Sequence, residues 1–418
     1  MWRPIVLLGK RTAAFIRLLK EKTRISPARS AIEPLENRTL LSGEIMVSSF
    51  MTFDATPTYD EPHIAVDAQG DFVVAWAGQT ATTSGSPVQV FTQRYNSNGL
   101  PLGTTTPVGA SGRSVGAPDV GMDPAGAYVV TWAGGVERFD SNGNSLGTAT
   151  TGGAANEFNP ADVGMDAQGD YTIDNDNNVQ QYNSSGDAVG SPIGIGAESS
   201  LAMNSAGNFV ITYWNTGGGI YARTYAANGT ATSGPILVSQ YSSAADQRFS
   251  SISINANGAF AVAWDDYGST QPGVYAQLFT SNGIPVGSSV QVSTASTGYN
   301  PGIAVNSDGS FEVTGVGPAP NNALDVQEFS SSATPIGSPY VLTQPTETNA
   351  KSGLLAATPT GFDAVWGDYP TNSNGFGIGT GEIVAEQVSL PEPTSACLIL
   401  VSAFLLLQKR PRSVSDRE

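Results

Sequence analysis

The chain has 418 residues and a formal net charge of −17; 40% of its residues are hydrophobic and only 13% are charged. This hydrophobic content excludes a disordered chain, and 48 glycines with 26 prolines argue against a helical one. We therefore expect an all-β protein with many short strands. The single cysteine, Cys397, excludes an intramolecular disulfide framework and a Cys-based zinc site, and the single histidine, His63, excludes a cluster of His ligands.

The charge is unevenly distributed along the chain. Residues 1–44 hold nine of the 19 Lys and Arg side chains, and residues 391–418 hold four more. Residues 45–390 therefore carry six basic side chains against 29 acidic ones. A body this acidic repels phosphate backbones, so we expect no nucleic-acid partner and some attraction for divalent cations.

Residues 1–44 are predicted to form a basic leader. Within it, residues 32–42 read IEPLENRTLLS, which resembles the Leu-Glu-x-Leu-Glu-x-Arg-x-Leu-Leu-Ser element near the start of many exported planctomycete proteins. Ile32 replaces the first Leu of that element. The resemblance implies export, although basic residues interrupt the apolar stretches that an ordinary signal peptide requires. A basic amphipathic helix on a membrane and a disordered leader are the alternatives.

Residues 45–390 are built on one internal repeat. Its first copy, residues 67–76, reads DAQGDFVVAW, and related phrases return six times at spacings of 38 to 56 residues. The glycines that mark the seven copies are Gly70, Gly126, Gly169, Gly207, Gly258, Gly309 and Gly361. An Asp or Asn shortly before a Gly is typical of a tight hairpin turn. The strand that follows, FVVAW in the first copy, is apolar on both faces, as expected for a blade packed between two neighbours.

Each copy continues with a third strand, a second Gly-containing turn and a fourth strand, which together describe a propeller blade. The seventh copy stops at residues 387–390 without a fourth strand, whereas residues 45–49, IMVSS, match residues 236–240, ILVSQ, the fourth strand of copy four. We therefore predict a seven-bladed β-propeller with four-stranded blades over residues 45–390. The N-terminal strand is expected to complete the last blade and remove the open edge. A linear array of β-sandwich modules is the alternative.

Residues 391–418 are predicted to form a sorting tail. They begin PEPTSACLILVSAFLLLQKRPR, in which a run of twelve mainly apolar residues precedes a basic cluster. As a helix this run rises only about 18 Å, short of a bilayer span. The three parts resemble, in order, the PEP-CTERM sorting signal of bacterial envelope proteins. The resemblance implies recognition by an exosortase, a membrane-embedded transpeptidase, and an anchor that is at least transiently in the membrane. The matching residues are Pro391, Glu392, Pro393, Lys409, Arg410 and Arg412. A buried helix or a hydrophobic tail without a sorting role is the alternative.

A functional face is predicted from the loops. The 1–2 and 3–4 turns of a blade emerge on one side of the ring, the turn face, and the 2–3 and 4–1 loops emerge on the other, the loop face. Only the 2–3 loops vary much in length, and such variation usually marks the functional face. The candidate binding residues expected there are Asp60, Glu61, Asp246, Arg248, Asp265, Asp266, Tyr267, Asp368 and Tyr369, with His63 in the same set of loops. Carboxylates beside aromatics suit calcium or carbohydrate contact, and solvated loop residues are the alternative.

No catalytic constellation is identified in the sequence. Ser-His-Asp chemistry would depend on His63 alone, and residues 174–178, DNDNN, lack the Gly and the distal Glu of a calcium loop. We predict an exported, non-catalytic propeller of the cell surface or matrix that binds polysaccharide or protein, with no cofactor unless calcium fixes its acidic loops. The alternative is a carbohydrate-active enzyme, similar to a glycoside hydrolase, that uses two carboxylates on the loop face.

Overall fold

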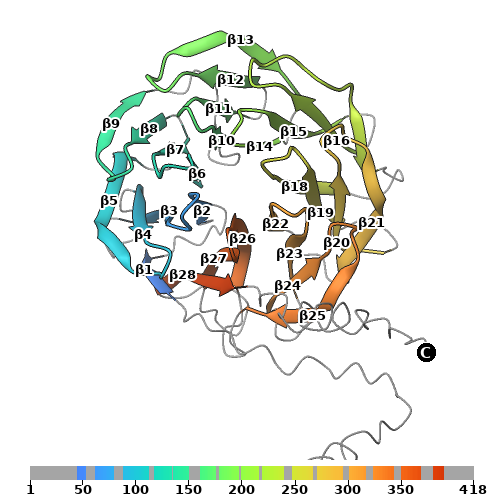
Figure 1. Cartoon of the computed structure of the whole chain (residues 1–418). Coiled ribbons are helices and arrows are strands. Elements are labelled where there is room, and N and C mark those ends of the chain that lie inside the picture. Colours follow the sequence, from blue (N-terminus) through green and yellow to red (C-terminus); the bar gives the residue numbers. More distant parts are fainter. Residues whose placement is uncertain are drawn as a thin grey trace, which may run out of the picture. The chain divides into compact units, whose positions relative to one another are not determined.

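A computed structural model describes residues 45–52, 62–79, 88–112, 117–133, 135–149, 161–175, 178–196, 199–215, 219–239, 247–266, 271–294, 301–316, 323–342, 350–368 and 380–389. These residues form 28 strands in seven four-stranded antiparallel sheets, and they include no helix. The sheets follow one another around a ring (Figure 1). The seven-bladed β-propeller predicted from the repeat is therefore confirmed.

The blades are numbered in chain order, and their strands run from the centre of the ring outward. Blade 1 holds β2 (His63–Val66), β3 (Phe72–Gln79), β4 (Val88–Tyr95) and β5 (Pro101–Gly112). Blade 2 holds β6 (Asp119–Met122), β7 (Tyr128–Trp132), β8 (Gly135–Phe139) and β9 (Ser145–Ala149). Blade 3 holds β10 (Asp162–Met165), β11 (Tyr171–Asp174), β12 (Asn178–Tyr182) and β13 (Ala188–Gly194). Blade 4 holds β14 (Ser200–Met203), β15 (Phe209–Trp214), β16 (Ile220–Tyr225) and β17 (Ile236–Ser239).

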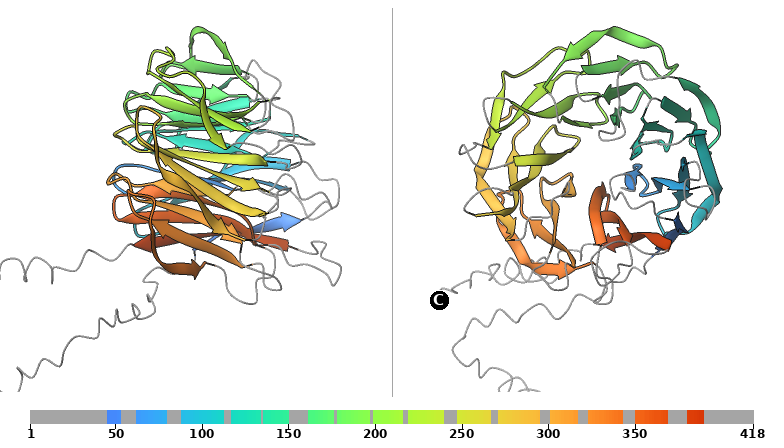
Figure 2. Two further views of the ribbon diagram at one scale, coloured as in Figure 1. Left: turned by 90° about the vertical axis from the view of Figure 1, so that its right-hand side faces the viewer. Right: turned by 180° about the vertical axis from the view of Figure 1, so that it is seen from behind.

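The remaining blades continue the same order around the ring (Figure 2). Blade 5 holds β18 (Gln247–Ile254), β19 (Phe260–Asp266), β20 (Gly273–Phe279) and β21 (Pro285–Ser293). Blade 6 holds β22 (Ile303–Val305), β23 (Phe311–Val316), β24 (Leu324–Phe329) and β25 (Pro335–Val341). Blade 7 holds β26 (Ala350–Thr358), β27 (Gly361–Asp368) and β28 (Thr380–Ser389), and its outermost strand is β1 (Ile45–Thr52).

The turn between the first two strands of a blade is held by its Asp or Asn side chain. In blade 1, Oδ1 of Asp67 accepts hydrogen bonds from the backbone N–H groups of Gln69 (2.8 Å) and Asp71 (2.9 Å). Gly70 closes the turn with φ of +83°, a conformation that side-chain-bearing residues rarely adopt. The same pair of bonds recurs at Asp123, Asp166, Asn204 and Asn255. The repeated Asp/Asn–Gly phrase is therefore a turn signal, as predicted.

Aromatic pairs fix each second strand to the third strand of the same blade. Phe72 stacks on Tyr95 with ring centroids 4.8 Å apart, and equivalent pairs stack in blades 2 to 6 at 4.6 to 5.0 Å. The alternating apolar side chains then face two different neighbours. Val73 and Ala75 pack against blade 2, whereas Val74 packs against blade 7. Every sheet is thus buried on both faces by adjacent sheets.

Strand β1 closes the ring, as the match between residues 45–49 and the fourth strand of copy four predicted. It pairs antiparallel with β28, with Ile45 opposite Ala385, and its Val47 is buried in the cluster shared by blades 7 and 1. The amide of Gln387 in β28 also donates to the backbone carbonyl of Ser97 in blade 1 at 3.3 Å. Residues from the two ends of the propeller therefore hold the first and last blades together.

Removing β1 should open the ring. Deletion of residues 1–52 exposes the edge of β28, so we expect the melting temperature to fall by about 10 °C or more. A chain that begins at residue 45 is the matched control and should melt within about 2 °C of the full chain. Differential scanning calorimetry measures both, and equal melting temperatures for the two truncations would contradict closure by β1.

Two buried acids stand at equivalent positions of blades 6 and 7, where four other blades have Val or Ala. Glu312 follows Phe311 at the start of β23, and Asp363 follows Phe362 in β27. Burial raises the pKa of Glu312 to about 8 and the pKa of Asp363 to about 7. Oε1 of Glu312 accepts a hydrogen bond from the amide of Asn306 at 2.7 Å. Both acids are therefore largely protonated in the folded protein below neutral pH.

These raised pKa values make the folded state bind more protons than the unfolded state between about pH 4.5 and pH 8. The free energy of unfolding should therefore fall as the pH rises from 5 to 8, by an amount on the order of a few kcal/mol. Glu312→Gln and Asp363→Asn should each flatten this dependence, while the exposed Asp187→Asn should not. Urea unfolding at several pH values measures the effect, and an unchanged slope in both buried-site variants would show that other groups cause it.

Candidate functional site

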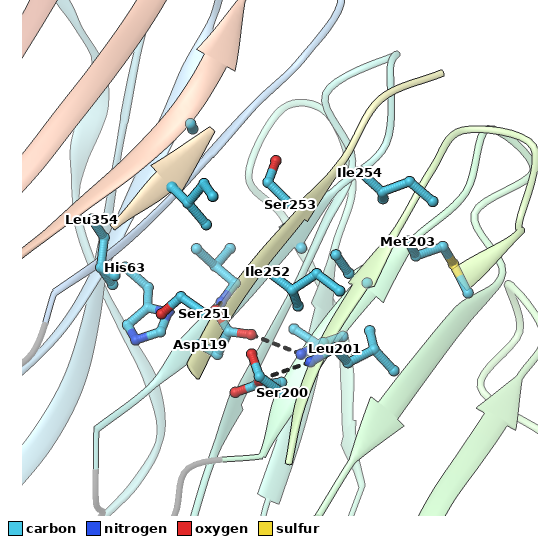
Figure 3. A pocket seen from close by; sticks show the side chains of 18 of the residues that line it. His63, Asp119, Ser200, Leu201, Met203, Ser251, Ile252, Ser253, Ile254 and Leu354 are labelled. Carbon is cyan, nitrogen blue, oxygen red and sulfur yellow. Dashed lines mark hydrogen bonds and ion pairs between the residues drawn. The ribbon is translucent and has the colours of Figure 1, made fainter. Parts of the chain in front are cut away.

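The centre of the ring encloses a cavity of about 690 Å³ (Figure 3). Its walls come from the innermost strands of all seven blades, β2, β6, β10, β14, β18, β22 and β26, together with Ser199 just before β14. The start of each of these strands pairs with the end of the second strand, so it lies toward the loop face. The cavity is therefore the place where functional side chains from different blades can meet.

In blades 1 to 4 the residue four positions before the turn Asp or Asn is the first residue of the inner strand, at its loop-face end. In blades 1 to 4 this residue is polar, and the four form what we call the acidic arc: His63, Asp119, Asp162 and Ser200. In blades 5 to 7 the same position holds Ser251, Gly302 and Leu354. The carboxylates and the imidazole are thus confined to one side of the ring, which the repeat itself does not require.

Hydrogen bonds across blade boundaries hold the arc together. Nδ1 of His63 donates to Oδ1 of Asp119 at 2.6 Å, and Oδ2 of Asp119 accepts from the backbone N–H of Val163 at 2.7 Å. Oδ2 of Asp162 accepts from the backbone N–H of Leu201 at 3.0 Å. These N–H groups lie on inner edge strands, so the acids occupy donors that no further strand would pair. Each carboxylate is positioned by the blade that follows it.

A third carboxylate lies behind the arc. Asp174 is the last residue of β11, only 1% exposed, and its Oδ1 accepts a hydrogen bond from the hydroxyl of Ser199 at 2.9 Å. The equivalent residues of blades 2, 4 and 6 are threonines, which bond to the residue five positions before the turn residue of the next blade: Thr131 to Ala161, Thr212 to Ser250 and Thr314 to Gly353. Blade 3 therefore keeps this link between blades but makes it with a carboxylate.

The environment of Asp162 favours its neutral form. Burial is the main cause, the charge of Asp119 adds to it, and His63 opposes it, so that the pKa of Asp162 is raised to about 7. Asp119, by contrast, accepts three hydrogen bonds, from His63, Val163 and the backbone N–H of Val120 at 2.7 Å. The two neighbouring carboxyl groups thus have different surroundings, and those of Asp162 favour its neutral form.

The candidate residues predicted from the sequence are only partly brought together. Asp265 and Asp266 are the last residues of β19 and are 2% and 8% exposed, so they are buried strand residues and not loop residues as expected. Their strand partners in β18 are Arg248 and Gln247, and Asp368 ends β27. His63 begins β2 instead of lying in a loop. Outside the described residues lie Asp60, Glu61, Asp246, Tyr267, Tyr369 and the sorting residues Pro391, Glu392, Pro393, Lys409, Arg410 and Arg412.

Sequence reasoning missed Asp119, Asp162 and Asp174. The signal for the first two was present as one column of the repeat, four residues before the turn Asp or Asn, where polar residues in early copies give way to Gly and Leu in later ones. Asp174 was considered only as part of residues 174–178, which lack the features of a calcium loop, and its contact with Ser199 depends on how blades 3 and 4 pack.

Two features are absent from the described residues. No group of three or more His, Cys, Asp or Glu side chains there is arranged to hold a metal ion. No helix long and apolar enough to cross a membrane occurs in that part of the chain. Calcium in the acidic loops therefore stays a prediction.

Solved propellers are similar to this chain in fold. The BP39L lectin from Burkholderia pseudomallei has a TM-score of 0.53 at 15% identity, over 80% of this chain and 97% of the lectin. The WD40 domain of Toxoplasma gondii coronin has a TM-score of 0.51 at 10% identity, over 84% and 86%. An α-L-arabinofuranosidase from Fusarium graminearum reaches 0.46 at 10% identity, over 83% and 97%. No protein-family model and no curated protein sequence matches the chain. At these identities the likeness shows the fold alone.

The coupling between the two acids of the arc can be measured directly. Asp119→Asn removes the neighbouring charge but keeps an oxygen to accept hydrogen bonds, so we expect the pKa of Asp162 to fall by about one unit. Carboxyl ¹³C chemical shifts followed against pH give this value. The control is Asp187→Asn, in the exposed turn between β12 and β13, which should leave the pKa of Asp162 unchanged. A pKa of Asp162 that stays at its wild-type value in Asp119→Asn would refute the coupling.

Proposed function

We propose that this chain is an exported, non-catalytic propeller of the cell surface or matrix that binds polysaccharide at its acidic arc. The observation that carries the proposal is the confinement of the imidazole, the carboxylates and Ser200 to one side of a central cavity, toward the loop face. Carboxylates and hydroxyls that converge on a cavity suit the hydroxyl groups of a saccharide. The variable loops predicted on the same face would extend the contact area.

Export and sorting are proposed from the two ends of the sequence. The leader element at residues 32–42 and the PEP-CTERM-like residues 391–412 support secretion, followed by processing by an exosortase-type enzyme. Strand β28 ends at Ser389 opposite Gly361, beside the first turn of blade 7, and β1 starts at the same end. The start of β1 and the end of β28 therefore both lie toward the turn face. An attachment through either one would leave the acidic arc on the opposite face, directed away from the point of attachment.

Binding should depend on the arc. We expect the full chain to bind at least one class of extracellular polysaccharide in a glycan panel, and His63→Ala with Ser200→Ala to weaken that binding about tenfold or more. Asp187→Asn, on the outer rim, is the control for folding and for general charge. Panel binding that is equal in the double variant and the wild type would place the site elsewhere.

A hydrolase is the second candidate, favoured by one observation. Asp119 accepts three hydrogen bonds while Asp162 is held near its neutral form, and glycosidases use a carboxylate and a carboxylic acid with such different environments. The wild type would then release reducing ends from the polysaccharide that it binds, and Asp162→Asn would retain binding but lose about a hundredfold or more of that rate. Binding without any release of reducing ends would leave the non-catalytic proposal.

A further inference from the structure

In its described part, the cavity is lined by ionisable side chains of the arc and by aliphatic side chains. Next to the arc, along the strands, the wall is formed by aliphatic residues at equivalent positions: Ile64, Val120, Val163, Leu201, Ile252, Ile303 and Leu355. Proteins commonly bind neutral sugar rings by stacking aromatic side chains on them as well as by hydrogen bonds. In the described part of this cavity, hydrogen bonds to a ligand can come from the arc and from serine hydroxyls, and the charged groups are those of the arc.

Those polar groups select for positive charge. The described lining contains the carboxyl groups of Asp119 and Asp162 and includes no Lys or Arg, and the body as a whole has 29 acidic against six basic side chains. A uronic acid or a sulfated sugar would meet this negative field, whereas a cationic group would be attracted. The negative charge of the cavity therefore favours cationic saccharides over anionic ones.

The hydrogen bonds of the arc indicate which acid receives the cation. Asp119 already accepts from His63, Val120 and Val163. Asp162 accepts from the backbone of Leu201 and from the hydroxyl of Ser200. A carboxylate has about four lone-pair sites, so Asp162 keeps the larger spare capacity. An ammonium group carries three donors and would pair with Asp162, while Ser200 and the partly exposed edge of His63 contact adjacent hydroxyls.

We propose that the acidic arc binds the protonated primary amine of an amino sugar, as carried by a de-acetylated hexosamine polymer. This rests on the proposed polysaccharide-binding function and names its ligand class. Because Asp162 holds a proton near neutrality, pairing with an ammonium group makes the acid ionise: the carboxyl O–H bond breaks, the proton passes to solvent, and the carboxylate faces the ammonium. Binding should therefore release up to one proton per amine and strengthen by roughly tenfold from pH 5.5 to pH 7.

The test is isothermal titration calorimetry of the full chain with glucosamine oligomers and with N-acetylglucosamine oligomers of the same length. Measurements at pH 6.5 in two buffers of different ionisation enthalpy give the protons released. We expect the free amine to bind at least about tenfold more tightly and to release protons. Asp162→Asn should abolish this preference and the proton release, whereas Ser251→Ala, the same position in blade 5, should change the affinity less than about twofold. Unchanged melting temperatures would establish that both variants fold.

The outcomes separate this inference from the proposed function. If both oligomers bind equally and no proton is released, the amine inference is wrong and polysaccharide binding stands. If neither oligomer nor any polysaccharide of the panel binds, both fall. If oligolysine binds in an Asp162-dependent manner and glucosamine oligomers do not, the site recognises amines of a protein and the amino-sugar assignment is wrong.

If Asp162→Asn keeps the preference for the amine, attraction by the overall negative charge explains that preference and the assignment of Asp162 is wrong. If Asp162→Asn does not fold, the wild type still tests the inference: proton release on binding glucosamine oligomers supports it, and binding without proton release contradicts it.

Discussion

The structure depends on one constraint: each sheet is apolar on both faces and therefore needs a neighbour on each side. Val73 and Ala75 of blade 1 pack against blade 2, while Val74 and Trp76 pack against blade 7. A linear stack would leave two apolar faces in water, so only a closed ring buries all seven sheets. Closure in turn requires that the two ends of the propeller meet in one blade, which β1 and β28 provide.

Within that ring the same repeat position has the same surroundings in every blade, so a residue that differs from its equivalents in the other blades needs its own explanation. Most inner positions need only to be small or apolar, as Gly121 and Gly164 illustrate: an added Cβ at Gly164 would lie 2.4 Å from the Cβ of Met203 in the next blade. Carboxylates in such a frame cost stability unless they have partners. Asp119 and Asp162 obtain theirs from the backbone of the next blade. Acids at a repeat position that holds Ser, Gly or Leu in blades 4 to 7 are therefore features that packing alone does not explain.

The fold could be predicted from the sequence because its signals are local and repeated seven times. The Asp or Asn and Gly of each turn, the alternating strand that follows and the fourth strand at residues 45–49 can all be recognised without knowing how the blades touch. Asp265 and Asp266 were expected in the 2–3 loop of blade 5, whereas pairing with β20 continues through both residues and makes them the last residues of β19. Strand ends are set by partner strands, and the single sequence does not contain that information. The contact of His63 with Asp119, 56 positions apart, likewise follows from the ring.

The bonds of the acidic arc also join its function to the closure of the ring. His63 bonds to blade 2, Asp119 to blade 3 and Asp162 to blade 4, so no blade contains the arc by itself. Blade 1 supplies the imidazole and is itself held in place by blade 7 through Val47 and Gln387. The contact of His63 with Asp119 thus spans two blades of the closed ring, and both residues influence the pKa of Asp162. The arrangement of the acidic arc that would recognise a ligand is therefore maintained by the same contacts between blades that bury the apolar faces of the sheets.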